Sequence, residues 1–228
     1  MALTVFQILN KISINNLEIK LKKCKPQIDK KVNHLTGDYV DLKITIEDIK
    51  NKNKQIQGLM KYDYLDMFKD RSGDNFQLRT KYVDFTFLCG SGLYVIVHSG
   101  VSESRVVKQN FARLVFLTQP PSILSCDITP PKMKDFLDAN PHSMFSCTWD
   151  GLDIPRLTGT NLKGGEIDAT DDFKRYDKHG MKKSIMFNLS TENITLSINR
   201  GASVHFYSKL SRDQQEEFMR SKILPLCR

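Results

Sequence analysis

The feature that most constrains the fold is an internal self-similarity between the middle of the chain and its C-terminal end. A strand pattern, a turn glycine, a serine at a helix start and an aliphatic helix end recur at one constant offset, without a gap. The matched pairs are Phe85 and Ile194, Thr86 and Thr195, Phe87 and Leu196, Gly92 and Gly201, Val95 and Val204, Ser99 and Ser208, Ser102 and Ser211, Leu114 and Ile223, and Val115 and Leu224. Two hairpin–helix units can also look alike by chance. A period above about 100 residues is too long for a solenoid, so we expect a pseudo-symmetric domain that arose by duplication.

Hydrophobic periodicity and turn residues give a coarse element order for the first half. We expect extended chain over 5–21, a short helix from Pro26 to about Leu35, a strand over 39–46 and a short helix over 59–68. A β-hairpin over 85–97 follows, with its turn at Gly90-Ser91-Gly92. Ser102 is then expected to cap a helix over 105–117, and Pro120-Pro121 closes the unit.

The second half is expected to begin again with a strand, over 122–128, and a short helix over 131–139. A strand over 143–149 precedes the segment 150–180, which is irregular and is expected to be a long loop or insertion. Strands over 194–198 and 204–207 flank a turn at Asn199-Arg200-Gly201. A helix then runs from its cap at Ser211 to about Leu226.

Composition favours a binding protein over an enzyme. The formal charge of +8 raises the expectation of a polyanionic partner, although a merely lysine-rich protein is the alternative. The odd set of five cysteines without a CxxC pair argues against a zinc ribbon or a disulfide framework and fits a reducing compartment. The histidines show no ligand spacing, and no nucleophile or phosphate-loop motif is present. We therefore expect no catalytic site, cofactor or metal, and no membrane segment.

Several short motifs, in a shared order, resemble the TATA-box-binding protein family. The residues that carry the resemblance are Ser91-Gly92-Leu93-Tyr94-Val95, Ser102-Glu103-Ser104-Arg105, Phe111-Ala112-Arg113-Leu114-Val115 (with one residue skipped), Ser125-Cys126-Asp127, and Phe218 with Ile223-Leu224-Pro225-Leu226. They cover under half of the chain. The resemblance implies an α+β saddle, in which two pseudo-symmetric repeats form a curved antiparallel sheet with helices on its convex side. The repeats would span 1–119, with an insertion at about 50–75, and 120–228, with an insertion at about 150–180.

The resemblance also implies that the concave sheet binds the minor groove of duplex DNA. The expected DNA-binding residues are Arg79, Lys81, Cys89, Ser91, Val95, Val97, Met181, Ile198, Arg200, Val204 and Phe206. Cys89, Ile198 and Met181, with residues near Ser72 to Phe76, occupy the positions of the family's apolar wedges. The family's groove-reading threonines fall on Val97 and Phe206, and its paired asparagines fall on Ile8 and Pro121. Because these residues depart from the family pattern, we expect relaxed or altered sequence preference.

Ser91 and Arg200 occupy turn positions that contact the DNA backbone in the family, and Arg79 and Lys81 add charge on the adjacent strand. The alternative for all four is a solvated hairpin tip and strand edge. The expected partners are duplex DNA, other initiation factors and an RNA polymerase, with a heteromeric complex also allowed. The expected location is the nucleus of a cell or the cytoplasmic replication site of a virus. The rival hypothesis is a protein–protein interaction module of the same fold that no longer binds DNA.

Overall fold

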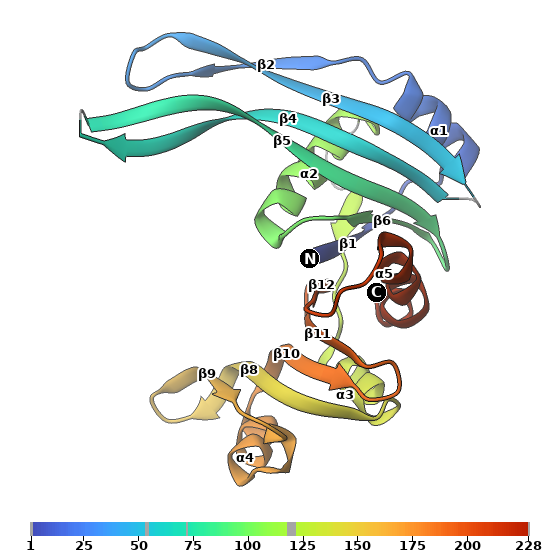
Figure 1. Cartoon of the computed structure of the whole chain (residues 1–228), viewed down its shortest axis with the longest axis vertical. Helices are drawn as coiled ribbons and strands as arrows, with labels where there is room; N and C mark the ends of the chain where they lie inside the picture. The colour runs from blue at the N-terminus through green and yellow to red at the C-terminus, as the bar shows by residue number, and fades with distance from the viewer. Residues whose placement is uncertain (1, 53–54, 72, 118–121, 228) are drawn as a thin grey trace. The chain divides into compact units, whose positions relative to one another are not determined.

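The chain folds into an α+β protein whose paired strands are antiparallel, which confirms the α+β part of the expected fold. The structure, a computed structural model, describes residues 2–52, 55–71, 73–117 and 122–227. Compactness divides the chain into two units (Figure 1). Unit 1 comprises Met1–Phe6 and Ser125–Arg228, and unit 2 comprises Gln7–Leu124. Among the described residues, no helix has the length and apolar character needed to span a bilayer.

Unit 2 is a twisted antiparallel sheet with two helices. Its elements are α1 (Ile14–Lys22), β2 (Gln27–Val32), β3 (Tyr39–Lys52), β4 (Gln55–Asp70), β5 (Gly73–Cys89), β6 (Leu93–Val97) and α2 (Val101–Leu114). The strands are hydrogen-bonded in the order β2-β3-β4-β5-β6. Strands β4 and β5 pair without interruption from Gln55 opposite Leu88 to the tip at Asp70 opposite Gly73. Their paired ends extend well beyond α2 (Figure 1).

Three phenylalanines form the centre of the unit 2 core. The ring of Phe111 on α2 lies 4.8 Å from that of Phe85 and 5.2 Å from that of Phe87, in edge-on contacts. Because side chains alternate along a strand, this places the odd-numbered side of β5 toward α2 and the even-numbered side away from it.

Unit 1 contains further antiparallel strands, and helices cover one face of the sheet that they form. Its elements are β1 (Ala2–Ile8, residues 2–6 of which belong to this unit), β7 (Ile123–Ser125, of which Ser125 belongs to this unit), α3 (Pro130–Asp138), β8 (His142–Ile154), β9 (Leu157–Lys163), a 3-10 turn (Ile167–Ala169), α4 (Asp171–His179), β10 (Met181–Leu189), β11 (Ile194–Asn199), β12 (Ser203–Phe206), α5 (Arg212–Phe218), a π-helical turn (Met219–Ile223) and a final 3-10 turn (Leu224–Leu226). The strands follow the order β1-β12-β11-β10-β8-β9.

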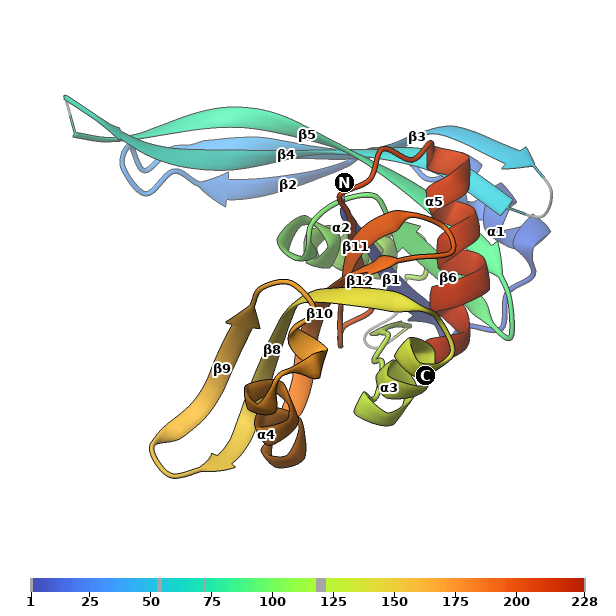
Figure 2. The same cartoon turned by 60° about the horizontal axis from the view of Figure 1, so that its bottom comes forward.

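Three ring contacts show which face of the unit 1 sheet the helices cover. Each joins a strand to a helix: Phe187 of β10 to Phe136 of α3 at 6.0 Å, Trp149 of β8 to Phe173 of α4 at 5.2 Å, and Phe206 of β12 to Phe218 of α5 at 5.4 Å. Figure 2 shows α4 lying against β8 and β10. The alternate residues of these strands therefore form a face that is directed away from the helices.

Several expected elements are wrong. The short helix expected from Pro26 to about Leu35 is the strand β2, and the helix expected over 59–68 is part of β4. Both segments are held by pairing with β3, and β4 also pairs with β5, so tertiary pairing overrides local preference. The extended chain expected over 5–21 contains α1, which Ser13 caps by accepting a hydrogen bond from the Asn16 backbone. The expected loop over 150–180 contains β9 and α4.

The two matched serines, Ser102 and Ser211, differ in their position relative to the start of the helix. Ser211 caps α5 in a reciprocal capping box with Gln214, which confirms the expected cap. The expected cap at Ser102 is wrong, because α2 begins at Val101 with Gly100 in the N-cap position. The expected hairpin over 85–97 and the helix near 131–139 are confirmed. Pro120-Pro121 and Ser72 lie outside the described residues.

Candidate nucleic-acid interface

The face of the unit 1 sheet directed away from α3, α4 and α5 is built from hydroxyl and amide side chains. We call it the polar face, and it consists of Ser146, Thr148, Asn161, Ser184, Met186, Asn188, Thr195, Ser197, Asn199 and His205. The register between β10 and β11 sets three cross-strand pairs side by side: Ser184 with Asn199, Met186 with Ser197, and Asn188 with Thr195. Met186 is the apolar side chain at its centre.

Hydrogen bonds between neighbouring strands hold the amides of the polar face in place. Asn188 Nδ2 donates to Thr195 Oγ1 at 3.0 Å, and Asn161 Nδ2 donates to the hydroxyls of Thr148 and Ser146. Asn199 Oδ1 accepts from the backbone N–H of Ser203 at 3.1 Å. Each hydroxyl oxygen has two lone pairs and a donor, so capacity to bind a further partner remains after these bonds are made.

The polar face carries no carboxylate or ammonium group in its interior. Burial lowers the pKa of His205, so its imidazole is neutral at pH 7. Charged groups lie at its borders. Lys163 of β9 is the register partner of Ser146 of β8, and the guanidinium of Arg200 lies 3.8 Å from the carboxylate of Asp150. This arrangement, neutral inside and charged at the borders, suits the minor groove, whose floor offers neutral acceptors between two phosphate backbones.

Five of the expected DNA-binding side chains do not lie on this face. Val95, Val97, Ile198, Val204 and Phe206 are almost completely buried. Val97 pairs with Phe85 on the side that packs against α2, and Phe206 packs against α5. These side chains are not accessible to a duplex, so their burial argues against the DNA-binding role expected for them.

For Ile198, Val204 and Phe206, the polar face lies one residue away along the strand, whereas Val95 and Val97 have buried neighbours on both sides. Shifting an alignment by one position exchanges the two faces of a strand. The neighbours in question, Ser197, Asn199 and His205, lie on the polar face. The available signal was the alternation of polar and apolar residues along β10 and β11, in which serine, asparagine and threonine fall on one side.

The three expected phosphate-binding cations each have a carboxylate partner. Arg79 lies 3.1 Å from Asp66, and Lys81 lies 2.7 Å from Glu103. The hydrogen bond to Glu103 raises the pKa of Lys81. Arg200 approaches Asp150, as described above. Exposed ion pairs contribute about 0–1 kcal/mol, so a phosphate can replace the carboxylate partner of Arg200 at small cost. Arg79 and Lys81, in contrast, lie on the odd-numbered side of β5, which is directed toward α2 and away from the open face of the sheet.

The remaining expected residues lie at exposed ends of strands. Cys89 is exposed at the end of β5, and the hydroxyl of Ser91 in the following turn lies 3.1 Å from that of Tyr94. Met181 is 45% exposed and pairs with Asp150, which places it at the border of the polar face. Of the expected set, Met181 and Arg200 are therefore the two that the fold brings to this face.

The corresponding face of unit 2, directed away from α2, has a different character. We call it the mixed face, and it includes Tyr39, Asp41, Lys43, Glu47, Lys61, Asp63, Leu78, Thr80, Tyr82 and Asp84. Thr80 Oγ1 donates to Asp63 at 2.6 Å, and Lys61 pairs with Glu47 and lies over the ring of Tyr82. Tyr39 is 72% exposed and Tyr82 is 64% exposed. The named residues include four carboxylates and two lysines, so this face has no excess of positive charge, while large apolar surfaces stay open.

The positive charge of the chain is concentrated in unit 2. This unit contains 19 Lys and Arg against 12 Asp and Glu, whereas unit 1 contains 15 against 14. The formal charges are therefore +7 and +1. Since the named residues of the mixed face carry no excess of positive charge, the excess lies elsewhere on unit 2, chiefly in the lysine-rich segment 20–31.

Comparison with known proteins does not assign the chain to a family. No family model and no curated protein matches the chain. Within residues 2–52, 55–71, 73–117 and 122–227, no group of three or more His, Cys, Asp or Glu side chains could hold a metal ion. The polar face is therefore interpreted from its own residues.

Proposed function

We propose that the chain is a TATA-box-binding-protein-like initiation factor that binds duplex DNA through its open sheet face, with relaxed sequence preference. The observation that carries the proposal is the polar face of unit 1, with its uncharged hydroxyl and amide side chains. The role is one of binding rather than catalysis. Its partners would be other initiation factors and an RNA polymerase, in a nucleus or at a viral replication site in the cytoplasm.

The element order of the two halves supports the proposal. Each half runs strand, helix, several antiparallel strands and helix: β1, α1, β2 to β6 and α2, then β7, α3, β8 to β12 and α5, with α4 inserted. The matched hairpins differ in register by two residues, because Val97 pairs with Phe85 whereas Phe206 pairs with Leu196. A shift of two residues keeps every side chain on its face, as two diverged copies of one unit require.

The chemistry of the polar face supports a minor-groove partner. The A·T minor groove presents only acceptors on its floor, and amide and hydroxyl donors can pair with them without distinguishing A·T from T·A. Proteins of this kind also insert apolar side chains between base steps, and Met186 and Met181 are available at the centre and border of the face. Such contacts discriminate weakly between sequences, which is the basis for the relaxed preference.

Fluorescence binding to short duplexes of varied sequence, at several salt concentrations, tests the proposal. We expect binding at low salt that weakens as salt rises, with bending detected by energy transfer between labelled duplex ends. Ser197→Asp places a negative charge within the polar face and should weaken binding by at least about tenfold, since opposed like charges cost several kcal/mol. Thr191→Asp adds the same charge in the exposed β10–β11 turn and should have little effect.

A second candidate function is an interaction module that binds proteins and not DNA. The mixed face favours it, because this face has no excess of positive charge while Tyr39, Leu78 and Tyr82 remain exposed. Failure of every duplex to bind at low salt would exclude the first proposal and leave this one. Equal binding by Ser197→Asp and the unsubstituted chain would show that DNA contacts another surface.

A further inference from the structure

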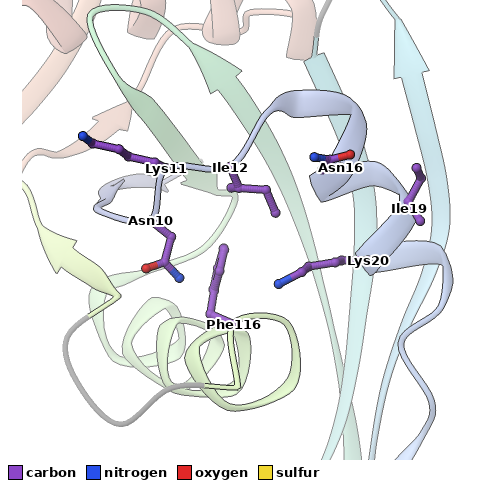
Figure 3. A pocket seen from close by; sticks show the side chains of 7 residues that line it. All are labelled: Asn10, Lys11, Ile12, Asn16, Ile19, Lys20 and Phe116. Atoms are coloured by element: carbon purple, nitrogen blue, oxygen red, sulfur yellow. The ribbon is translucent and has the colours of Figure 1, made fainter.

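Two adjoining cavities in unit 2 form a groove along α1, which we call the α1 groove. One has a volume of about 610 Å³ and is bordered by the chain before α1 and by the end of α2 (Figure 3). The other, of about 640 Å³, lies between the C-terminal end of α1, the start of β2 and the end of α2. Ile19 and Lys20 line both cavities. The two cavities therefore share a wall and can accommodate one extended ligand.

The border of the α1 groove is cationic. Lys11, Lys20, Lys23, Lys25 and Arg113 line it, and none of its described lining residues is acidic. Arg113 pairs with Asp29 at 2.7 Å. In the described part of the chain, no carboxylate forms an ion pair with any of the four lysines. This differs from Arg79, Lys61 and Lys81 on the strands, each of which has a carboxylate neighbour.

The floor of the α1 groove is apolar. Ile12 and Phe116 point into the first cavity, and the side chain of Lys20 extends toward Phe116 (Figure 3). Ile19 is 50% exposed and Leu117 is 82% exposed. Large exposed aliphatic side chains grouped in a concave surface are typical of a site that another molecule covers.

The cationic border and the apolar floor together indicate which class of ligand the α1 groove would bind. A nucleic-acid backbone needs cations but no aliphatic floor, and bases bind by stacking on open aromatic rings. Phe116 is the one aromatic residue among the described residues that line the groove, and it is only 4% exposed. An acidic peptide with aliphatic anchors satisfies both the cations and the apolar floor. We propose that the α1 groove binds an acidic, leucine-containing segment of a partner protein. This inference goes beyond DNA binding by the polar face and stands independently of it.

Fluorescence polarisation with a short labelled peptide, in which aspartates alternate with leucines, tests the proposal on the full chain. We expect saturable binding that weakens with salt. Lys20→Glu combined with Lys23→Glu should reduce affinity by about tenfold or more. Ile19→Ser, at a half-exposed position, should reduce it about threefold to tenfold through lost apolar contact. Circular dichroism establishes that each variant is folded.

Matched controls separate groove binding from general charge attraction. Lys69→Glu with Lys209→Glu makes the same charge change at exposed positions outside the groove and should leave peptide affinity within about twofold. Replacing the peptide leucines with serines should weaken binding to the unsubstituted chain. The proposal is wrong if the control pair lowers affinity as much as the groove pair, or if the serine peptide binds equally well. It is also wrong if a single-stranded oligonucleotide binds more tightly and is insensitive to Ile19→Ser. None of these peptide-binding results depends on Ser197. Failure of peptide binding at the α1 groove can therefore be distinguished from failure of DNA binding at the polar face.

Discussion

At the scale of single residues, the core of unit 2 depends on the absence of a side chain at Gly58. A Cβ built there would lie 2.5 Å from Phe85 Cζ and 2.6 Å from Ile49 Cδ1, closer than real Cβ contacts. Phe85 cannot move aside easily, since its ring is in edge contact with Phe87 and Phe111. Gly58 therefore allows β4 to pair closely beneath the aromatic cluster.

Replacing Gly58 with alanine should lower the free energy of unfolding by about 1–3 kcal/mol, the usual cost of overpacking a core. Urea unfolding measures the change. Gly165→Ala is the matched control, because a Cβ at that position meets nothing within 4 Å. Equal midpoints for Gly58→Ala and the unsubstituted chain would contradict the described packing.

Burial raises the pKa of the Cys147 thiol to about 12. A group with a raised pKa in the folded state contributes stability that is present below its unfolded pKa, near 9, and is lost as pH rises toward the folded value. The stability of the unsubstituted chain should thus fall relative to Cys147→Ala as pH rises above about 9. Urea unfolding of both proteins at about pH 8 and pH 10.5 measures this, and a constant difference between them would contradict it.

At the scale of elements, the two matched helices begin differently. In α5 the Ser211 hydroxyl accepts from the Gln214 backbone at 3.3 Å, and the Gln214 side chain accepts from the Ser211 backbone at 2.9 Å. Ser102 lies inside α2, and Gly100 in the N-cap position provides no side-chain hydrogen bond. The sequence pattern around both serines is similar. The difference in capping therefore arises from the position at which each helix begins after the preceding strand.

The two serines therefore predict opposite outcomes for one substitution. Ser211→Ala should cost about 1 kcal/mol of stability, because it leaves an N–H at the helix start without its partner. Ser102→Ala should be neutral or slightly stabilising, because alanine is the better residue within a helix. Thermal or urea unfolding distinguishes them. Equal losses at both sites would show that Ser102 also acts as a cap.

At the scale of the whole molecule, charge and sheet chemistry are distributed unequally. Unit 2 carries nearly all of the net positive charge, while the polar face belongs to unit 1.

Charge reversal at Lys81 and Arg200 tests the phosphate role at this scale. Arg200→Glu should weaken binding to all duplex sequences alike and reduce the dependence of affinity on salt, whereas Lys81→Glu, on the side of β5 that faces α2, should have a smaller effect. Lys69→Glu is a control with the same charge change at the far end of β4. Loss of binding for one sequence alone would assign base contacts, and not phosphate contacts, to these residues.

Local pattern alone determined the hairpin over 85–97, the helix near 131–139 and the cap at Ser211, since each depends on neighbouring residues, whereas the α+β class was expected from the family resemblance. Tertiary structure decided the identity of β2 and β4, because strands without a strong local signal form where partners exist to pair with them. It also decided which side of each strand faces the helices. Alternation specifies two faces, but only packing specifies which is buried, and one residue of slip exchanges them. The α1 groove likewise depends on tertiary structure. It brings the segment around Lys11 and Lys20 close to the segment around Arg113, and no local sequence pattern predicts that these segments are neighbours.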